Sequence, residues 1–314
     1  MARAAGKYFS SGALVLGYHR IADVAWDPLN LAVGIENFRR QVEYLSRIRQ
    51  VVSLGELVRL QQAGRPMEKY AALTFDDGYG DFRELACPVL REARAPATVF
   101  VATGFTGDAF WWEQIVELLD PRNSSDGTLT LDFGEGGSRS FENLDGTEGA
   151  TLAARNICHQ LRAGNQQQIS AILQQLRAWA GSRNSTDVCA RPLEAGEIES
   201  LFAEGLVEIG AHTVSHGCLG EMAPADQQKE IERSRIALES ITRGTVSTFS
   251  YPNGSYSRET PEIVRRAGFR SACSSRQASF RSRDDCFLVP RIWAPNVGQR
   301  GFEVLLSKWV RIPP

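Results

Sequence analysis

The sequence predicts an α/β fold built on a parallel sheet, and two observations support this class. Short, nearly continuous apolar runs recur along the chain, as expected for parallel strands that are covered on both faces. Amphipathic helical patterns lie between these runs, and such alternation favours a barrel or an open parallel sheet. The predicted strands are Ala13–Tyr18, Ala71–Phe75, Ala97–Ala102, Leu206–Gly210, Val246–Tyr251, Arg270–Cys273 and Phe287–Ile292.

Three helices can be placed from periodicity and from their end signals. Over 35–48 the apolar residues recur at helical spacing. The tetrapeptide Ser53–Glu56 has the pattern of a capping box and predicts a helix through about residue 62. In Thr260-Pro261 we expect the threonine at the N-cap and the proline at the first helical position, with the helix ending near residue 268.

The stretch 104–200 departs from this alternation. We predict that the chain forms a single domain over 1–314 and that this stretch is a mostly helical insertion within it. The insertion begins with glycines and the aromatic cluster Phe110–Trp112. Long segments of this kind often carry function, so we expect a lid or cap.

Inside the insertion, the elements are less sharply defined. The segment 123–149 is rich in Gly, Ser and Asp, and the alternation over Thr128–Phe133 leaves a small hairpin and a mobile loop both open. Two helical patterns follow, roughly over 150–163 and 166–181.

Composition and charge exclude several classes of protein. The chain has 35 Lys and Arg against 37 Asp and Glu, so a dominant basic surface and nucleic-acid binding are not expected. No apolar run approaches the roughly 18 residues of a membrane helix, and none near the start resembles a signal peptide. The six cysteines have irregular spacing and predict reduced thiols. We therefore expect a cytoplasmic protein, with peripheral membrane association left open.

Two adjacent carboxylates, Asp76 and Asp77, follow an apolar strand and precede a glycine turn. The pattern suits an ordinary Asp-Gly turn. It also suits a site in which one carboxylate ligates a metal while its neighbour acts as a base, because adjacent residues at a strand end point in different directions.

The chain contains four histidines, and His212 and His216 lie four residues apart at the end of another apolar strand. They are either unrelated or, if the chain turns helically there, neighbours on one side. Neutral imidazole is a common ligand of Zn²⁺, and two imidazoles with one carboxylate leave the open position of a catalytic metal site. We expect a divalent metal, Zn²⁺ foremost, although Co²⁺, Ni²⁺ and Fe²⁺ suit the same ligands.

These motifs resemble those of the polysaccharide deacetylases, the NodB-homology carbohydrate esterases. The resemblance rests on T-F-D-D-G at 74–78 and H-T-V-S-H at 212–216. In addition, Y-H-R at 18–20 and F-S-Y-P-N-G at 249–254 are similar to the branch that includes poly-N-acetylglucosamine deacetylases. Apart from most of the insertion, the resemblance runs from about residue 12 to about residue 295. It implies a distorted (β/α)7-type barrel with its active site at the C-terminal strand ends.

The resemblance also implies the reaction. An N-acetyl group would be removed from an N-acetylated glycan, or from a lipid-linked or nucleotide-linked sugar of surface-polysaccharide synthesis, with release of acetate. Asp77, His212 and His216 would ligate the metal, and Asp76 would be the general base for the attacking water. A backbone N–H in the loop Pro252-Asn253 or near Tyr79 would hold the oxyanion. Substrate contacts are predicted at Tyr79, Tyr251, Pro252, Asn253 and Trp293, with Trp111 and Trp112 either stacking on sugar rings or packing in the core.

Two departures from the family pattern matter. Many members carry an arginine where this chain has Ser250, and Arg291 is our candidate replacement, with a surface salt bridge as the alternative. Many members also use a late histidine as general acid, but no histidine follows His216. We predict that His19 takes this role, with a packed position as the alternative, and that His159 is incidental.

Two other functions stay open at this point. One is a catalytically silent carbohydrate-binding member of the fold, which both departures favour and the intact Asp and His pairs disfavour. The other is an amidohydrolase acting on a non-sugar amide, which the Y-H-R and F-S-Y-P-N-G motifs disfavour.

Overall fold

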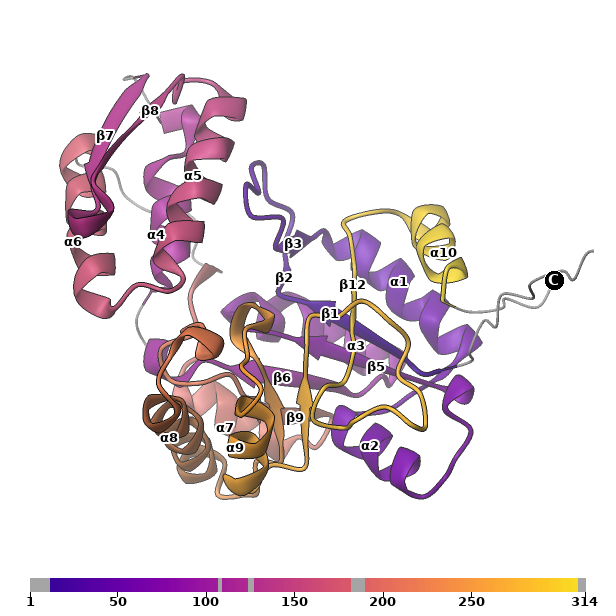
Figure 1. Cartoon of the computed structure of the whole chain (residues 1–314). Helices are drawn as coiled ribbons and strands as arrows, with labels where there is room; N and C mark the ends of the chain where they lie inside the picture. The colour runs from indigo at the N-terminus through magenta and orange to yellow at the C-terminus, as the bar shows by residue number, and fades with distance from the viewer. Residues whose placement is uncertain (1–11, 107–108, 124–126, 182–189, 310–314) are drawn as a thin grey trace, which may run out of the picture.

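The computed structural model describes residues 12–106, 109–123, 127–181 and 190–309 (Figure 1). Its centre is a parallel sheet in the order β11-β10-β9-β6-β5-β1-β12, with β4 also paired to β5. The strands of this sheet are β1 (Leu14–Tyr18), β4 (Gln50–Val51), β5 (Tyr70–Phe75), β6 (Ala97–Val101), β9 (Val207–Ala211), β10 (Thr248–Ser250), β11 (Ser271–Cys273) and β12 (Ile292–Trp293).

The segment that closes the sheet is not the continuous strand that we predicted over Phe287–Ile292. Val289 pairs in parallel with Cys273 of β11, whereas Ile292 pairs with β1, so the segment joins both edges of the sheet. Pro290 lies between these pairings and has no N–H to donate to a ladder. The sheet therefore curls into a distorted barrel, which confirms the predicted fold class.

Helices cover the outside of this barrel (Figure 1). The helix predicted over 35–48 has those bounds in the structure. The helices around the barrel are α1 (Ile35–Ile48), α2 (Leu54–Gln62), α3 (Cys87–Ala93), α7 (Ala195–Ala203), α8 (Pro224–Thr242), α9 (Thr260–Arg266) and α10 (Gln299–Ser307).

The predicted caps are only partly correct. Ser53 Oγ accepts a hydrogen bond from the Glu56 N–H at 3.3 Å, but the Glu56 carboxylate pairs with Arg59 and does not complete a capping box. Helix α9 already includes Thr260 as its first residue, with Glu259 at the N-cap position. The Thr260 hydroxyl instead accepts from the N–H of Ser257 at 2.8 Å, outside the helix.

The insertion has a hydrophobic core of its own, built from helices and a hairpin, and stands as a separate body beside the barrel in Figure 1. The antiparallel pair forms the predicted hairpin, so the alternative of an irregular loop is wrong for the paired residues. Its elements are α4 (Trp111–Leu118), β7 (Thr128–Asp132), β8 (Ser138–Glu142), α5 (Thr147–Leu161) and α6 (Gln166–Ala180).

One helix of the predicted 104–200 stretch belongs to the barrel. Ile198 and Leu201 of α7 are fully buried in the same core as the barrel strands. The insertion body described here thus ends by Gly181, and 182–189 lies outside the described residues. That the insertion acts as a lid or cap stays a prediction.

A short two-stranded ribbon, β2 (Arg20–Ile21) and β3 (Ala32–Val33), follows β1 and approaches α5 of the insertion (Figure 1). In the part of the chain that the structure describes, no helix is long and apolar enough to cross a bilayer. Five cysteines are free thiols, as predicted, and Cys189 lies outside the described residues.

Candidate active site

The predicted site residues follow the C-terminal ends of neighbouring strands. Tyr18 of β1 pairs with Phe75 of β5, and the next residues are His19 and Asp76. Because the carboxyl ends of parallel strands meet at one edge, these side chains converge on one cavity. The cavity has a volume of about 370 Å³, within the usual range of small-molecule sites. It is lined by His19, Asp76, Asp77, His212, His216, Asn253, Arg291 and Trp293, together with residues of the insertion.

Three side chains present ligand atoms to one point in this cavity. Asp77 Oδ1 lies 3.4 Å from His212 Nε2 and 3.2 Å from His216 Nε2, and all three ligand atoms lie within 4.8 Å of one another. Asp77 Oδ1 is buried and has no hydrogen-bond partner among the described residues. A buried carboxylate oxygen without a partner is costly, and a divalent cation would satisfy it. Two imidazoles and one carboxylate therefore fit the expected metal.

The tautomer of His212 also suits a metal ligand. Its Nδ1 lies 2.8 Å from the carbonyl oxygen of Ser250, and a carbonyl only accepts, so Nδ1 carries the proton and donates it. The Nε2 lone pair is then left facing Asp77. Metal-binding histidines are commonly oriented in this way by a second hydrogen bond.

Backbone strain is concentrated around the same residues. Asp77, Thr213, His216 and Asn253 have φ of +71°, +65°, +58° and +55°, in the left-handed region that non-glycine residues rarely adopt. Such conformations cost on the order of 1–3 kcal/mol each and often occur at functional sites. The strain at Asp77 and His216 accompanies the convergence of their ligand atoms.

Asp76 is held by the arginine that we predicted as its partner. Arg291 Nη1 and Nη2 donate to Asp76 Oδ1 and Oδ2 at 2.6 and 2.7 Å. Arg291 is 1% exposed, so the alternative of a surface salt bridge is wrong. Ser250 Oγ accepts from Arg291 at 3.0 Å and lies 3.3 Å from Asp76 Oδ2. Burial alone would raise the pKa of Asp76, but the charge and the hydrogen bonds of Arg291 hold it below its ordinary value.

His19 and Trp293 both line the cavity, and their rings lie against each other. The two rings stack with centroids 4.9 Å apart, and Arg291 Cζ lies 4.6 Å from the Trp293 ring centroid. A Cβ at Gly17 would lie 2.7 Å from the Trp293 ring, so only glycine leaves room for this indole. Burial lowers the pKa of His19, which favours the neutral imidazole.

Tyr79, predicted to contact substrate, has a fully buried side chain that does not line the cavity. Its hydroxyl donates to Glu113 and accepts from Trp112 Nε1, both at 2.6 Å. The Trp112 ring in turn lies 4.7 Å from the His216 ring, between centroids. Tyr79 therefore packs behind the Trp112 wall of the cavity, so its side chain does not reach the substrate space, whereas an oxyanion-binding backbone N–H near Tyr79 stays a prediction.

The F-S-Y-P-N-G loop contributes fewer cavity residues than predicted. Tyr251 is buried and donates to the carbonyl oxygen of Phe287 at 2.9 Å, and neither Tyr251 nor Pro252 lines the cavity. Asn253 does line it, as do Trp111 and Trp293. Tyr251 packs in the core and not in the cavity, because its ring fills the core while its hydroxyl donates to a backbone carbonyl.

Behind the site, the buried carboxylate of Asp81 pairs with Arg20, which also contacts Glu113. Arg20 donates to Asp81 at 2.8 Å and to Glu113 at 3.4 Å. Asp81 is fully buried. Despite the partial compensation by Arg20, burial raises the pKa of Asp81 to about 7.

This raised pKa predicts a pH-dependent stability. Because the folded pKa lies above the unfolded value, the folded state binds the proton more tightly, and the associated stabilisation is lost as the pH rises from about 4 through about 7. Between pH 5.5 and 8 we expect a loss of about 2 kcal/mol, and the Asp81→Asn protein should lack it. Thermal unfolding of both proteins from pH 5.5 to 8 measures this difference. Parallel pH profiles for the two proteins would rule out Asp81 as the titrating group.

One wall of the cavity comes from helix α5 of the insertion. Arg155, Cys158, His159 and Arg162 line it, so the prediction that His159 is incidental to the site is wrong. Their spacing of three, four and seven residues is that of one helical face. This pattern is visible in the sequence, but only the folded chain shows that the face looks into the cavity.

Comparison with known proteins agrees with this geometry. The family model described as polysaccharide deacetylase matches residues 63–124 and 158–272. The poly-beta-1,6-N-acetyl-D-glucosamine N-deacetylase of Staphylococcus aureus (strain MSSA476) is 18% identical over 324 residues, covering 96% of this chain and 84% of that protein.

Two solved structures share the fold. The Streptococcus pyogenes deacetylase PplD, in complex with acetate, has a TM-score of 0.63 at 19% identity, covering 95% of this chain and 98% of that one. IcaB from Ammonifex degensii has a TM-score of 0.60 at 19% identity, covering 96% and 97%. At this level of identity the likeness establishes the fold alone, and the chemistry must be argued from the site itself.

Proposed function

The chain belongs to the polysaccharide deacetylase family, and we propose that it is a metal-dependent N-deacetylase that releases acetate from an N-acetylated sugar of a surface polysaccharide or its precursor. One observation carries this proposal. The ligand atoms of Asp77, His212 and His216 converge beside a carboxylate, Asp76, that is held ionised by Arg291 in the same cavity.

The geometry supports a separate role for each carboxylate. A divalent cation held by Asp77, His212 and His216 would supply Lewis acidity to the amide carbonyl and to the attacking water. The carboxylate of Asp76 is not part of that group of ligand atoms. Its carboxylate is charged and accepts the proton of the water as the water adds to the carbonyl carbon.

The second half of the reaction breaks the carbon–nitrogen bond. The amine nitrogen takes a proton as it leaves, and acetate and a free amino sugar are the products. His19 faces the same cavity and is our proposed donor of that proton, with Trp293 fixing its ring. Since burial favours neutral His19, its ring must first gain a proton, and the proton that Asp76 takes from the water supplies it and returns Asp76 to its charged form.

Acetate release tests the proposed function directly. The protein with one equivalent of Zn²⁺ is incubated with N-acetylglucosamine oligomers and with UDP-N-acetylglucosamine, and acetate and new amines are counted separately for each. We expect equal amounts of both products, loss of activity with a chelator, and recovery when Zn²⁺ is restored. Sugar binding without acetate release from the metal-loaded protein would instead support a silent carbohydrate-binding protein. Acetate release only from non-sugar amides would support an amidohydrolase.

The assignment of His19 predicts a separable effect on turnover. We expect His19→Asn to keep its bound metal and to lower kcat by about 10²- to 10⁴-fold, the usual range for a positioned proton donor. Metal content and kcat are measured on the same preparation, with His159→Asn as the matched variant. Unchanged turnover in His19→Asn, with a loss in His159→Asn, would transfer the role to His159.

A further inference from the structure

The cavity wall formed by α5 has a chemistry that the deacetylation reaction does not use. Arg155 and Arg162 lie seven residues apart on this wall, about 10 Å along the helix axis, with His159 between them. The buried apolar residues Ala153, Ala154 and Ile157 of α5 face the core of the insertion instead. The cationic face is therefore the one directed at the ligand space.

The cavity wall formed by α5 carries positive charge that no acidic side chain of the described residues pairs with. The charged lining of the cavity consists of Asp76, Asp77, Arg291, Arg155 and Arg162. Asp76 pairs with Arg291, and Asp77 belongs to the candidate metal group. The two α5 arginines have no ion pair among the described residues, although the chain as a whole has a net charge of −2.

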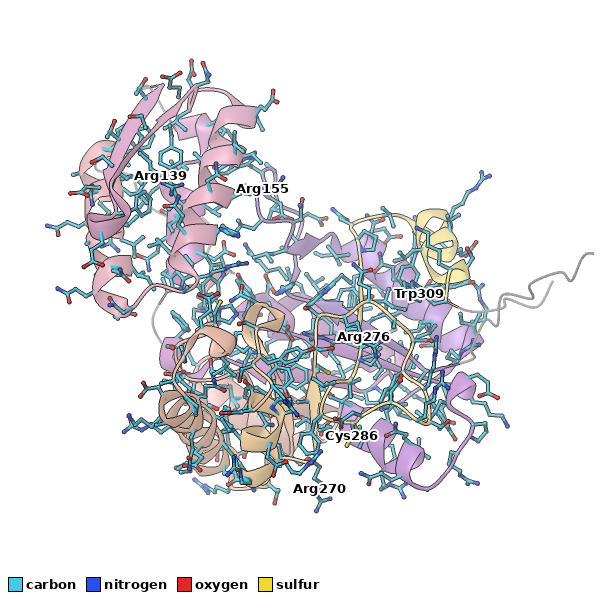
Figure 2. The ribbon with its side chains drawn as sticks, in the orientation of Figure 1. Arg139, Arg155, Arg270, Arg276, Cys286 and Trp309 are labelled. Carbon is cyan, nitrogen blue, oxygen red and sulfur yellow. The ribbon has the colours of Figure 1, made fainter. Side chains whose placement is uncertain are left out.

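Two hydrogen bonds hold α5 against the segment between β2 and β3. Trp26 Nε1 donates to Thr151 Oγ1 at 2.9 Å, and Arg155 Nε donates to the carbonyl oxygen of Pro28 at 2.5 Å. Figure 2 shows Arg155 on the side of α5 that faces this segment. The bond through Nε leaves the two terminal nitrogens of the Arg155 guanidinium for a ligand.

Arg162 directly follows the last residue of α5 and lines the same cavity as Arg155 and His159. Asn253 Nδ2 donates to Cys218 Sγ at 3.7 Å, and Asn253 itself lines the cavity. Both arginines thus line the cavity that contains the candidate metal group.

We propose that this α5 face binds a phosphate or diphosphate group attached to the sugar, so that the protein acts on a phosphorylated, activated precursor rather than on a neutral finished polymer. The inference rests on the proposed function. Guanidinium groups match phosphate oxygens with paired hydrogen bonds. Two of them with His159 between offer donors to more than one anionic group, which suits a diphosphate better than a single carboxylate. A nucleotide-linked sugar and an isoprenoid-lipid-linked sugar present this same chemistry.

Binding to the full chain tests the inference by calorimetry. The probes are N-acetylglucosamine 1-phosphate, UDP-N-acetylglucosamine and the neutral methyl glycoside of N-acetylglucosamine. We expect both phosphorylated probes to bind at least about tenfold more tightly than the glycoside, with an advantage that shrinks as salt is added. In Arg155→Gln/Arg162→Gln this advantage should disappear, whereas glycoside binding should not change. Arg233→Gln, at an exposed position on α8, is the matched control.

One further probe identifies the source of the phosphate. Weaker binding of UDP-N-acetylglucosamine than of N-acetylglucosamine linked to an isoprenoid diphosphate in detergent assigns the site to a lipid carrier, and the reverse order assigns it to a nucleotide. Equal affinity of the wild-type protein for the phosphorylated and neutral probes would overturn the inference, and so would tighter binding of N-acetylmuramic acid, which carries a carboxylate. Retained phosphosugar binding without acetate release from any probe would contradict the proposed function instead.

Discussion

The Asp77→Ala protein is expected to bind no stoichiometric divalent metal and to lose at least about 10³-fold in acetate release. Asp77 provides the one carboxylate oxygen of the candidate ligand group, and its Oδ1 lies within 3.4 Å of both imidazole nitrogens. Without it, two imidazoles remain, one fewer ligand than catalytic zinc sites use. Losses of this size are typical when electrostatic stabilisation of the developing oxyanion is removed.

Metal content and activity must fall together for this account to hold. Both are measured on one preparation, by elemental analysis and by acetate release, with His212→Ala as a second disruption of the same group. Asp226→Ala is the matched control, since Asp226 is exposed on α8 and pairs only with Lys229 among the described residues. An Asp77→Ala protein that keeps a full equivalent of metal would contradict the assignment of this carboxylate as a ligand.

The Arg291→Met protein is expected to lose both stability and activity. Asp76 would then keep a buried negative charge without the guanidinium that now contacts both of its oxygens. Removing one partner of a buried ion pair costs about 3–5 kcal/mol of folding free energy. Asp76 would respond by taking up a proton, and a protonated carboxyl cannot serve as the base.

A double-mutant cycle separates these two effects. In Arg291→Met/Asp76→Asn no buried charge is left unpaired, so we expect most of the folding free energy to return while acetate release stays lost. Chemical denaturation measures the first quantity and kcat the second. Arg291→Met with a folding free energy within about 1 kcal/mol of wild type would show that the pair is not the buried contact described here.

The parallel α/β fold and the centre of the site were accessible from the sequence because both depend on local patterns, whereas the closed barrel was implied only by the family resemblance. Apolar strands alternate with amphipathic helices, and the polar residues that follow the strands must meet at one edge of a parallel sheet. This reasoning places Asp76, Asp77, His212 and Arg291 around one cavity, where the structure has them. It failed over Phe287–Ile292, where Pro290 interrupts the ladder within an apolar run.

The remaining errors concern long-range packing. The side chains of Tyr79 and Tyr251 belong to motifs at the site, but each ring turns into the core, where its hydroxyl finds a partner. His159 was set aside because nothing in the local sequence says how the insertion is oriented on the barrel. Contacts of Trp26 with Thr151 and of Arg155 with Pro28 fix that orientation, across more than 120 residues of sequence.

We propose that Asp77 is a metal ligand and that the adjacent Asp76 is the base. A crystal structure of the Zn²⁺-loaded protein distinguishes these two roles. Anomalous diffraction at the zinc edge locates the ion without reference to the protein atoms. We expect one ion bonded to Asp77 Oδ1, His212 Nε2 and His216 Nε2, with Asp76 still paired to Arg291 and outside bonding distance of the ion. An ion bonded to Asp76 in place of Asp77, or zinc bound elsewhere in the crystal with this group empty, would contradict the account.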